Sequence, residues 1–342
     1  MDGSVHRVAH FPIAKFGLKY FLSATRMRIW SSSVYLLLVL SRVPLAAQPE
    51  NRDGLLPPVS FDRSAGVTPI RQAIAARNLT LAQKKAEELC LREPGNSELL
   101  LWAGYVALSQ GKFYDAIRYL RRAESLDPNA FVLKLLAVSY YAAHQPRLFL
   151  LKIHAAQQKQ PDDFAPYYYL GRYFDSDLGD YSQAVDNFKH ALARQPDHFH
   201  SHYYLGQCYE TEGEAERAEV EYRRALELAE RQRAADVGLP YQGLARLRLS
   251  SQRPAEALQF AQRAVELLPH DATSHKLLAK TYLELGRNAE SAAEWEITGE
   301  LDPTDASPQY RLYRIYLTSG DVEKARSALA RYKRIAALYG TN

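Results

Sequence analysis

The chain has 342 residues, enough for two ordinary globular domains or for one long repeat array. Its 17 Gly and 17 Pro are too few for a collagenous or a disordered chain. Residues 1–47 hold six Lys or Arg and one Asp, which leaves 37 basic against 38 acidic residues in 48–342. The formal charge of +4 therefore comes from the leader, and the body lacks the positive field that nucleic-acid binding needs. We expect no nucleic-acid partner.

Residues 1–47 have the three-part pattern of a secretory signal. Met27-Arg28 gives a basic start, Val34–Leu40 gives a short apolar core, and Pro44–Ala47 ends in small residues. Because the apolar run is too short for a comfortable membrane span, we predict cleavage near Ala47 and a periplasmic or secreted protein. The alternative is a retained leader that anchors the chain in the inner membrane, facing the periplasm. Met27 is also a candidate translation start.

Residues 48–67 mix Pro, Gly and charge without a helical period, which predicts a linker. From residue 68 to 342 the chain repeats itself, because prolines that end helices recur about every 34 residues. They are Pro94, Pro128, Pro161, Pro196, Pro269 and Pro303. A fixed period of this length predicts stacked helix pairs that bury their faces against one another. We count eight units, which begin near residue 68, Ser97, Ala130, Phe164, Phe199, Gly238, Ala272 and Ala306.

Small residues in one helix of each unit lie opposite large ones in the other. Gly171 and Gly206 stand in first helices, and Phe188 and Tyr222 stand in the second helices that follow them. The pattern resembles the tetratricopeptide repeat family. The unit from Phe199 matches its signature at Leu205, Gly206, Tyr209, Gly213, Ala218, Tyr222 and Ala225. The resemblance implies an all-α, right-handed superhelical solenoid of antiparallel helix pairs, whose first helices line a concave face.

The first unit is degenerate, with a short opening helix, and three further units depart from the family pattern. The unit from Ala130 has Phe149 where a small residue is expected, and its turn at residues 144–146 lacks the usual Gly. The unit from Phe164 has one extra residue in its turn. The unit from Phe199 has no proline stop, so we predict that its second helix runs about one turn longer than its counterparts.

The resemblance also implies which residues point into the groove. Counted from the first residue of each unit, these are positions two, five, nine and twelve. The candidate ligand-binding residues are Tyr168, Arg172, His200, Tyr203, Gln207, Arg246, Lys276, Lys280, Tyr310 and Arg314. Tyr and Arg suit peptide recognition, and the basic C-terminal end favours an acidic segment or a C-terminal carboxylate. The alternative is a solvated face without a ligand. No position nine is Asn, which disfavours the clamp that some family members use on chaperone C-termini.

Other chemistry has weaker support in the sequence. His198, His200 and His202 lie close together, and a metal or small-ligand site there is the alternative function. Cys90 and Cys208 fall in different units, so we expect two buried thiols rather than a disulfide. No catalytic or cofactor motif is found, and we expect no enzyme activity and no cofactor. The sequence favours an exported, non-catalytic scaffold that binds a protein or peptide segment.

Overall fold

The computed structural model describes Leu55 and residues 65–339. In this part of the chain there are sixteen α-helices and no strand, and the helices pair in chain order into eight units. The first helices are α2 (Thr68–Ala75), α4 (Ser97–Ser109), α6 (Ala130–Ala142), α8 (Ala165–Tyr173), α10 (Phe199–Thr211), α12 (Gly238–Ser250), α14 (Ala272–Glu284) and α16 (Ser307–Thr318). The second helices are α3 (Leu79–Arg92), α5 (Phe113–Leu126), α7 (Pro146–Lys159), α9 (Tyr181–Arg194), α11 (Ala215–Arg231), α13 (Pro254–Leu267), α15 (Asn288–Leu301) and α17 (Val322–Tyr339). The predicted all-α repeat solenoid is confirmed.

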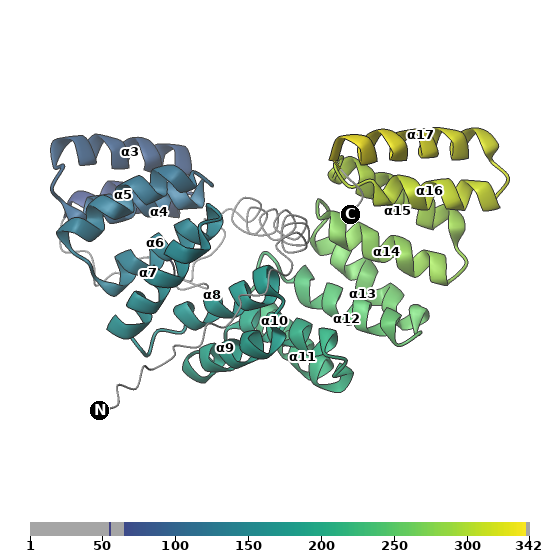
Figure 1. Cartoon of the computed structure of the whole chain (residues 1–342), viewed down its shortest axis with the longest axis horizontal. Helices are drawn as coiled ribbons and strands as arrows, with labels where there is room; N and C mark the ends of the chain where they lie inside the picture. The colour runs from purple at the N-terminus through teal and green to yellow at the C-terminus, as the bar shows by residue number, and fades with distance from the viewer. Residues whose placement is uncertain (1–54, 56–64, 340–342) are drawn as a thin grey trace, which may run out of the picture.

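The units follow one another along an open arch (Figure 1). Each helix packs on its pair mate and on the next helix along the chain. Neighbouring first helices also contact each other, as α10 does with α12 and α12 does with α14. The first helices therefore lie on the inner side of the curve, and the second helices lie on its outer side.

Polar side chains begin many of these helices. Asn78, Asn129, Asp180 and Asp271 each accept a hydrogen bond from a backbone N–H in the first turn of the helix that follows. Between the helices of a unit the chain turns through one residue of positive φ. In the unit from Ala130 this residue is His144, with φ of 56°, so the turn keeps its shape without the usual Gly.

The predicted packing of small residues against large ones is present. An added Cβ on Gly206 would lie 2.9 Å from the ring of Tyr222, and one on Gly171 would lie 2.7 Å from the ring of Phe188. The large side chain that stands where a small one is expected is also buried in this packing. Phe149 is fully buried, with its ring centroid 5.0 Å from that of Tyr141 and 5.3 Å from that of Tyr173. Neighbouring aromatic rings thus take the place of close backbone contact.

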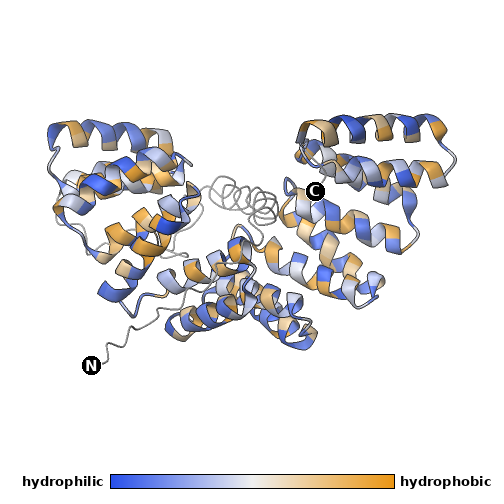
Figure 2. Ribbon diagram, in the orientation of Figure 1, coloured by the Kyte–Doolittle hydropathy of each residue, from blue (hydrophilic) through white to orange (hydrophobic). Residues whose placement is uncertain are grey.

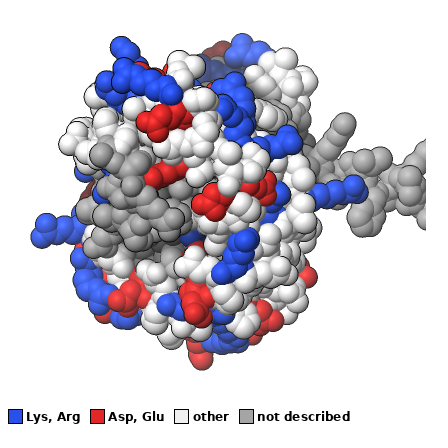
Figure 3. Space-filling model, turned by 90° about the vertical axis from the view of Figure 1, so that its left-hand side faces the viewer, with Lys and Arg blue, Asp and Glu red and all other residues white. Residues whose placement is uncertain are grey.

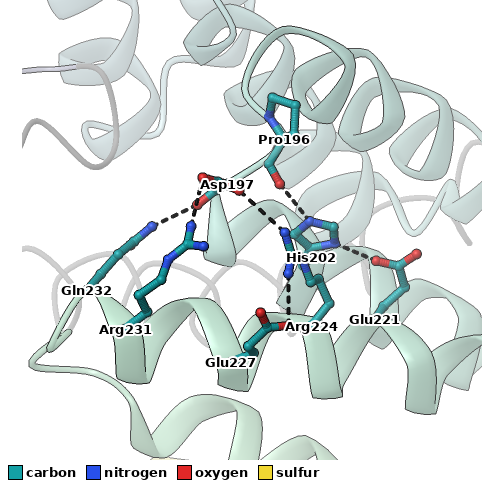
Figure 4. Close-up of polar contacts among 8 residues, drawn as sticks. All are labelled: Pro196, Asp197, His202, Glu221, Arg224, Glu227, Arg231 and Gln232. Atoms are coloured by element: carbon teal, nitrogen blue, oxygen red, sulfur yellow. Dashed lines mark hydrogen bonds and ion pairs between the residues drawn. The ribbon is translucent and has the colours of Figure 1, made fainter.

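The other two departures have visible consequences. The extra residue in the unit from Phe164 is taken up by a π-helical turn, η4 (Phe174–Leu178), at the end of α8. Helix α11 has 17 residues where α9 and α13 have 14, as predicted. Its last turn reaches back to the loop before α10, because Arg231 donates to Asp197 Oδ2 at 2.7 Å (Figure 4). Beyond it, Gln232 donates to the Asp197 carbonyl at 2.9 Å.

The predicted leader and most of the predicted linker lie outside the described residues. Two parts of the linker stretch are described, and each holds a buried apolar side chain. Residues 65–67 form a short 3₁₀ helix, η3, whose Val67 is fully buried, and Leu55 is 5% exposed. None of the described helices is long and apolar enough to cross a membrane.

Candidate ligand-binding inner face

The candidate groove residues fall into two groups by exposure. Tyr168, Arg172, His200 and Tyr203, in the middle of the array, are buried. Gln207, Arg246 and Lys276 are partly buried, and Lys280, Tyr310 and Arg314 are exposed. The middle of the inner face is therefore closely packed, and the accessible candidates lie toward the C-terminal end.

A buried arginine organises the middle of the face. The Arg172 guanidinium donates to the Tyr168 hydroxyl at 3.2 Å and lies 4.2 Å from the ring centroid of Tyr204. Nearby, the Cys208 thiol donates to Asp175 of the π-helical turn, and burial raises the pKa of that carboxyl. The aromatic and charged groups expected to meet a ligand here contact one another instead. Cys90 and Cys208 are both free and buried, as expected.

Arg246 connects two successive units through hydrogen bonds to the side chains of Glu210 and Tyr222. Its Nε donates to both carboxylate oxygens of Glu210 at 2.9 Å, and its Nη2 donates to the Tyr222 hydroxyl at 2.8 Å. Tyr222 in turn donates to Glu210 at 2.6 Å. The charge of Arg246 is therefore compensated by Glu210 within the array, across the boundary between α10 and α12.

In three units the side chain at position five contacts an aspartate just before the next first helix, and we call such a pair a position-five latch. These pairs were not predicted from the sequence. Lys134 contacts Asp163 at 2.5 Å, and Gln242 donates to Asp271 at 2.7 Å. Lys276 contacts Asp305 at 3.1 Å. All three aspartates also accept a backbone N–H at the start of the next first helix. The signal was present in the sequence, because an Asp follows each of these three position-five residues by 29 positions.

The uncompensated cations lie on α14 and α16. Three cations have no side-chain hydrogen bond or ion-pair partner among the described residues, and they are Lys280, Arg311 and Arg314. Two of them, Arg311 and Arg314, are one turn apart on α16. The pKa of Lys280 is lowered, first by its partial burial and then by the nearby charges of Lys276, Arg311 and Arg246. Such a site is favourable for an anion. Arg311 was not among the predicted residues, because position six is not an inward position in the family pattern.

The three clustered histidines face separate partners. His198 Nδ1 lies 2.7 Å from Ser201 Oγ, and His200 Nε2 lies 2.5 Å from Asp236 Oδ2. Both ring nitrogens of His202 are engaged, by Glu221 at 2.6 Å and by the Pro196 carbonyl at 3.0 Å (Figure 4). No group of three or more potential metal ligands converges within the described ranges. The geometry therefore does not favour a metal site at these imidazoles.

The described residues at the end formed by the N-terminal units carry charges of both signs. Figure 3 looks at this end and shows basic and acidic side chains interspersed over it. Several of them form short-range pairs along one helix, such as Arg92 with Glu88 and Arg118 with Asp115. Exposed pairs of this kind contribute little to stability and leave little net charge for a ligand.

Comparison with known proteins agrees with this geometry. The tetratricopeptide repeat family model matches residues 70–131 and 175–235. No curated protein sequence matches the chain. Among solved structures, the APC/C hetero-tetramer Cut9–Hcn1 gives a TM-score of 0.63 at 18% identity, over 85% of this chain and 58% of that one. Yeast Tom70 gives 0.57 at 14% identity, over 93% of this chain and 72% of that one.

A tetratricopeptide repeat protein from Parabacteroides merdae gives a TM-score of 0.56 at 16% identity, over 76% of this chain and all of that one. At these identities the structural likeness shows the fold alone. The tetratricopeptide repeats that the family model matches support a protein–protein interaction scaffold. Together with the eight helix pairs and the small-against-large packing, the family-model match at residues 70–131 and 175–235 supports a tetratricopeptide repeat protein.

Proposed function

We propose that the chain is an exported, non-catalytic scaffold that binds a protein or peptide segment along its inner face. We further propose that the C-terminal part of this face takes an acidic segment or a C-terminal carboxylate. One observation carries the second statement: Lys280, Arg311 and Arg314 have no compensating partner in the described part of the chain. The nearby Arg246 and Lys276 have theirs in Glu210 and Asp305.

The chemistry of these three cations selects the ligand. Lys280, whose ammonium group lies near Lys276, Arg311 and Arg246, gains most from a carboxylate, because charge-assisted hydrogen bonds are stronger than neutral ones. Two guanidinium groups one turn apart can hold a carboxylate in a bidentate manner. Tyr310, which is 41% exposed on the same helix, adds apolar contact area with a polar end.

A charge-reversal variant tests this site. Lys280→Glu, Arg311→Glu and Arg314→Glu together should abolish capture of the partner from an extract of the native cells. The matched control is Arg331→Glu, Lys333→Glu and Arg334→Glu, the same change of charge on exposed positions of α17. We expect full capture with the control and at least about a tenfold weaker binding with the first variant. Equal recovery with both variants would show that the partner does not use this site.

Export is a separate part of the proposal, supported by the three-part pattern of residues 1–47. N-terminal sequencing of the protein purified from its native cells tests it. A mature chain that begins close to Gln48 supports cleavage, whereas a chain that begins at Met1 or Met27 and fractionates with membranes supports a retained anchor. A full-length chain in the cytosolic fraction would contradict both.

A further inference from the structure

Cations recur along the C-terminal part of the inner face with the period of the repeat. Arg246, Lys280 and Arg314 stand at position nine of three successive units, 34 residues apart. Their helices, α12, α14 and α16, follow one another along the arch (Figure 1). Helix α12 contacts α14, and Lys276 Nζ of α14 lies 3.3 Å from Ser307 Oγ at the start of α16. Because packed helices lie about 8–10 Å apart, the three positions form a cation ladder with a step of about that length.

Two steps of this cation ladder are open to a ligand. Arg246 has its compensating carboxylate on α10. Lys280 on α14, and Arg311 with Arg314 on α16, have no such partner among the described residues. Desolvation lowers the pKa of Lys280, and so do three nearby cations, one of which is Arg311, so both steps belong to one positive patch. A ligand that neutralises both steps carries two anions about one helix spacing apart and needs none opposite α12.

The backbone conformation of a peptide decides which of its side chains can match this spacing. In a polyproline II helix, residues i and i+3 lie on one face about 9.3 Å apart, whereas residues i and i+2 of a β-strand are about 7 Å apart. An α-helix reaches about 10.5 Å with residues seven apart, but it bonds its own carbonyls internally. Lysine and arginine side chains are donors only, so unpartnered cations favour a backbone whose carbonyls are free, as in polyproline II.

An open aromatic ring lies beside the second step. Tyr310 is 41% exposed and lies one turn from Arg314 on α16. Its ring centroid is 6.3 Å from that of Tyr313 and 5.5 Å from that of Tyr332, so neighbouring rings support it. Proline-rich segments dock on aromatic surfaces of this kind, because their preformed helix loses little entropy on binding.

We propose that the ligand of this site is a proline-rich acidic segment in the polyproline II conformation, with two carboxylates three residues apart. One carboxylate meets Lys280, and the other meets Arg311 and Arg314. A proline beside the second carboxylate packs on Tyr310. This inference rests on the proposed acidic site and adds the conformation and the spacing of its ligand, which can be an internal segment without a free C-terminus.

Peptides of one composition test the spacing. Each has two Glu and six Pro and is blocked at both ends, and the two Glu are three apart, two apart or adjacent. By fluorescence anisotropy with the full-length chain, we expect the first peptide to bind at least about tenfold tighter, because only it places both charges on one face at the ladder step. Equal binding of all three would overturn the spacing and leave the acidic site in place. Binding of none of them at low ionic strength would contradict the acidic site as well.

Variants of the array assign the contacts. Lys280→Gln and Arg314→Gln should each remove most of the preference for the three-residue spacing, and Arg331→Gln, at an exposed position of α17, should keep it. Tyr310→Ser should weaken binding of the proline-rich peptide more than binding of a version with Ala in place of every Pro. Circular dichroism establishes that the variants fold. A preference that survives in Lys280→Gln, or tighter binding of an Ala-rich helical peptide with Glu seven apart, would overturn the assignment.

Discussion

The inner faces of the two halves of the array differ although their frames are the same. In α4 and α6 the inward side chains are mainly apolar and buried, whereas α14 and α16 present Lys280, Tyr310 and Arg314 to solvent. Figure 2 shows the same contrast, with hydrophobic colour concentrated around α6 and more hydrophilic colour along α14 and α16. Small-against-large packing is found in both halves. The repeat therefore sets the fold, and the side chains at the inward positions set the chemistry of each inner face.

The largest expected effect is the loss of a buried aromatic side chain in the N-terminal half. Phe149→Ala should lower the free energy of unfolding by about 3–5 kcal/mol, because the fully buried ring packs against Tyr141 and Tyr173 and leaves a cavity. Tyr310→Ala, at an exposed position of the C-terminal half, should change it by less than about 1 kcal/mol. Denaturant titration of the two variants measures the difference. Equal losses would contradict the contrast between the halves.

The position-five latch allows a matched test at the same place in the repeat. Lys134 is 4% exposed and its partner Asp163 is 11% exposed, so Lys134→Ala leaves a buried carboxylate unpaired and should cost about 3 kcal/mol. Lys276 is 37% exposed, and Lys276→Ala should cost less than about 1 kcal/mol because solvent screens its pair with Asp305. Thermal or denaturant unfolding compares them. A Lys276 variant as damaging as the Lys134 variant would show that exposure does not distinguish the latches.

A smaller effect should appear as a pH dependence in the C-terminal half. The pKa of His275 is raised above 6.5, first by its hydrogen bond to Glu294 and also by the Pro269 carbonyl, with burial opposing both. Folded His275 therefore keeps its proton at a pH where the unfolded chain loses it. This stabilisation is complete below pH 6.5 and is lost as the pH rises through the folded pKa. The stability difference between the parent and His275→Gln should shrink between pH 6 and pH 9, and a difference that grows would contradict the assignment.

The smallest effect on stability is expected at Lys280. Because this side chain has no partner among the described residues and sits near other cations, Lys280→Ala should change the free energy of unfolding by less than about 0.5 kcal/mol. The same variant should weaken binding of an acidic peptide, as fluorescence anisotropy can measure. A variant that binds the peptide as well as the parent would remove Lys280 from the site.

Much of the fold could be predicted because it depends on local signals that recur. Prolines that end helices, and small residues facing large ones, located the helix pairs, including the longer α11. The packing of Phe149 could not be predicted, because Tyr173 reaches it from the following unit.

The candidate site was predicted only in part. Lys280, Tyr310 and Arg314 are exposed on the inner helices, but the burial of Tyr168, Arg172 and Tyr203 depends on contacts between units. Arg246 is a predicted groove residue, but its charge is compensated by Glu210, which precedes it by 36 residues in the chain. Pairings of this kind follow from the curvature of the array, which the repeat pattern alone does not specify.

Hydroxyl-radical footprinting read by mass spectrometry tests the contrast between the two inner faces most directly. Tyr105 and Tyr141 are 3% and 7% exposed on α4 and α6, and Tyr310 is 41% exposed on α16. In the intact protein, Tyr310 should be oxidised rapidly while Tyr105 and Tyr141 are protected, and an acidic ligand should slow only Tyr310. Oxidation of Tyr105 as fast as that of Tyr310 would show that the N-terminal inner face is open and would contradict the account.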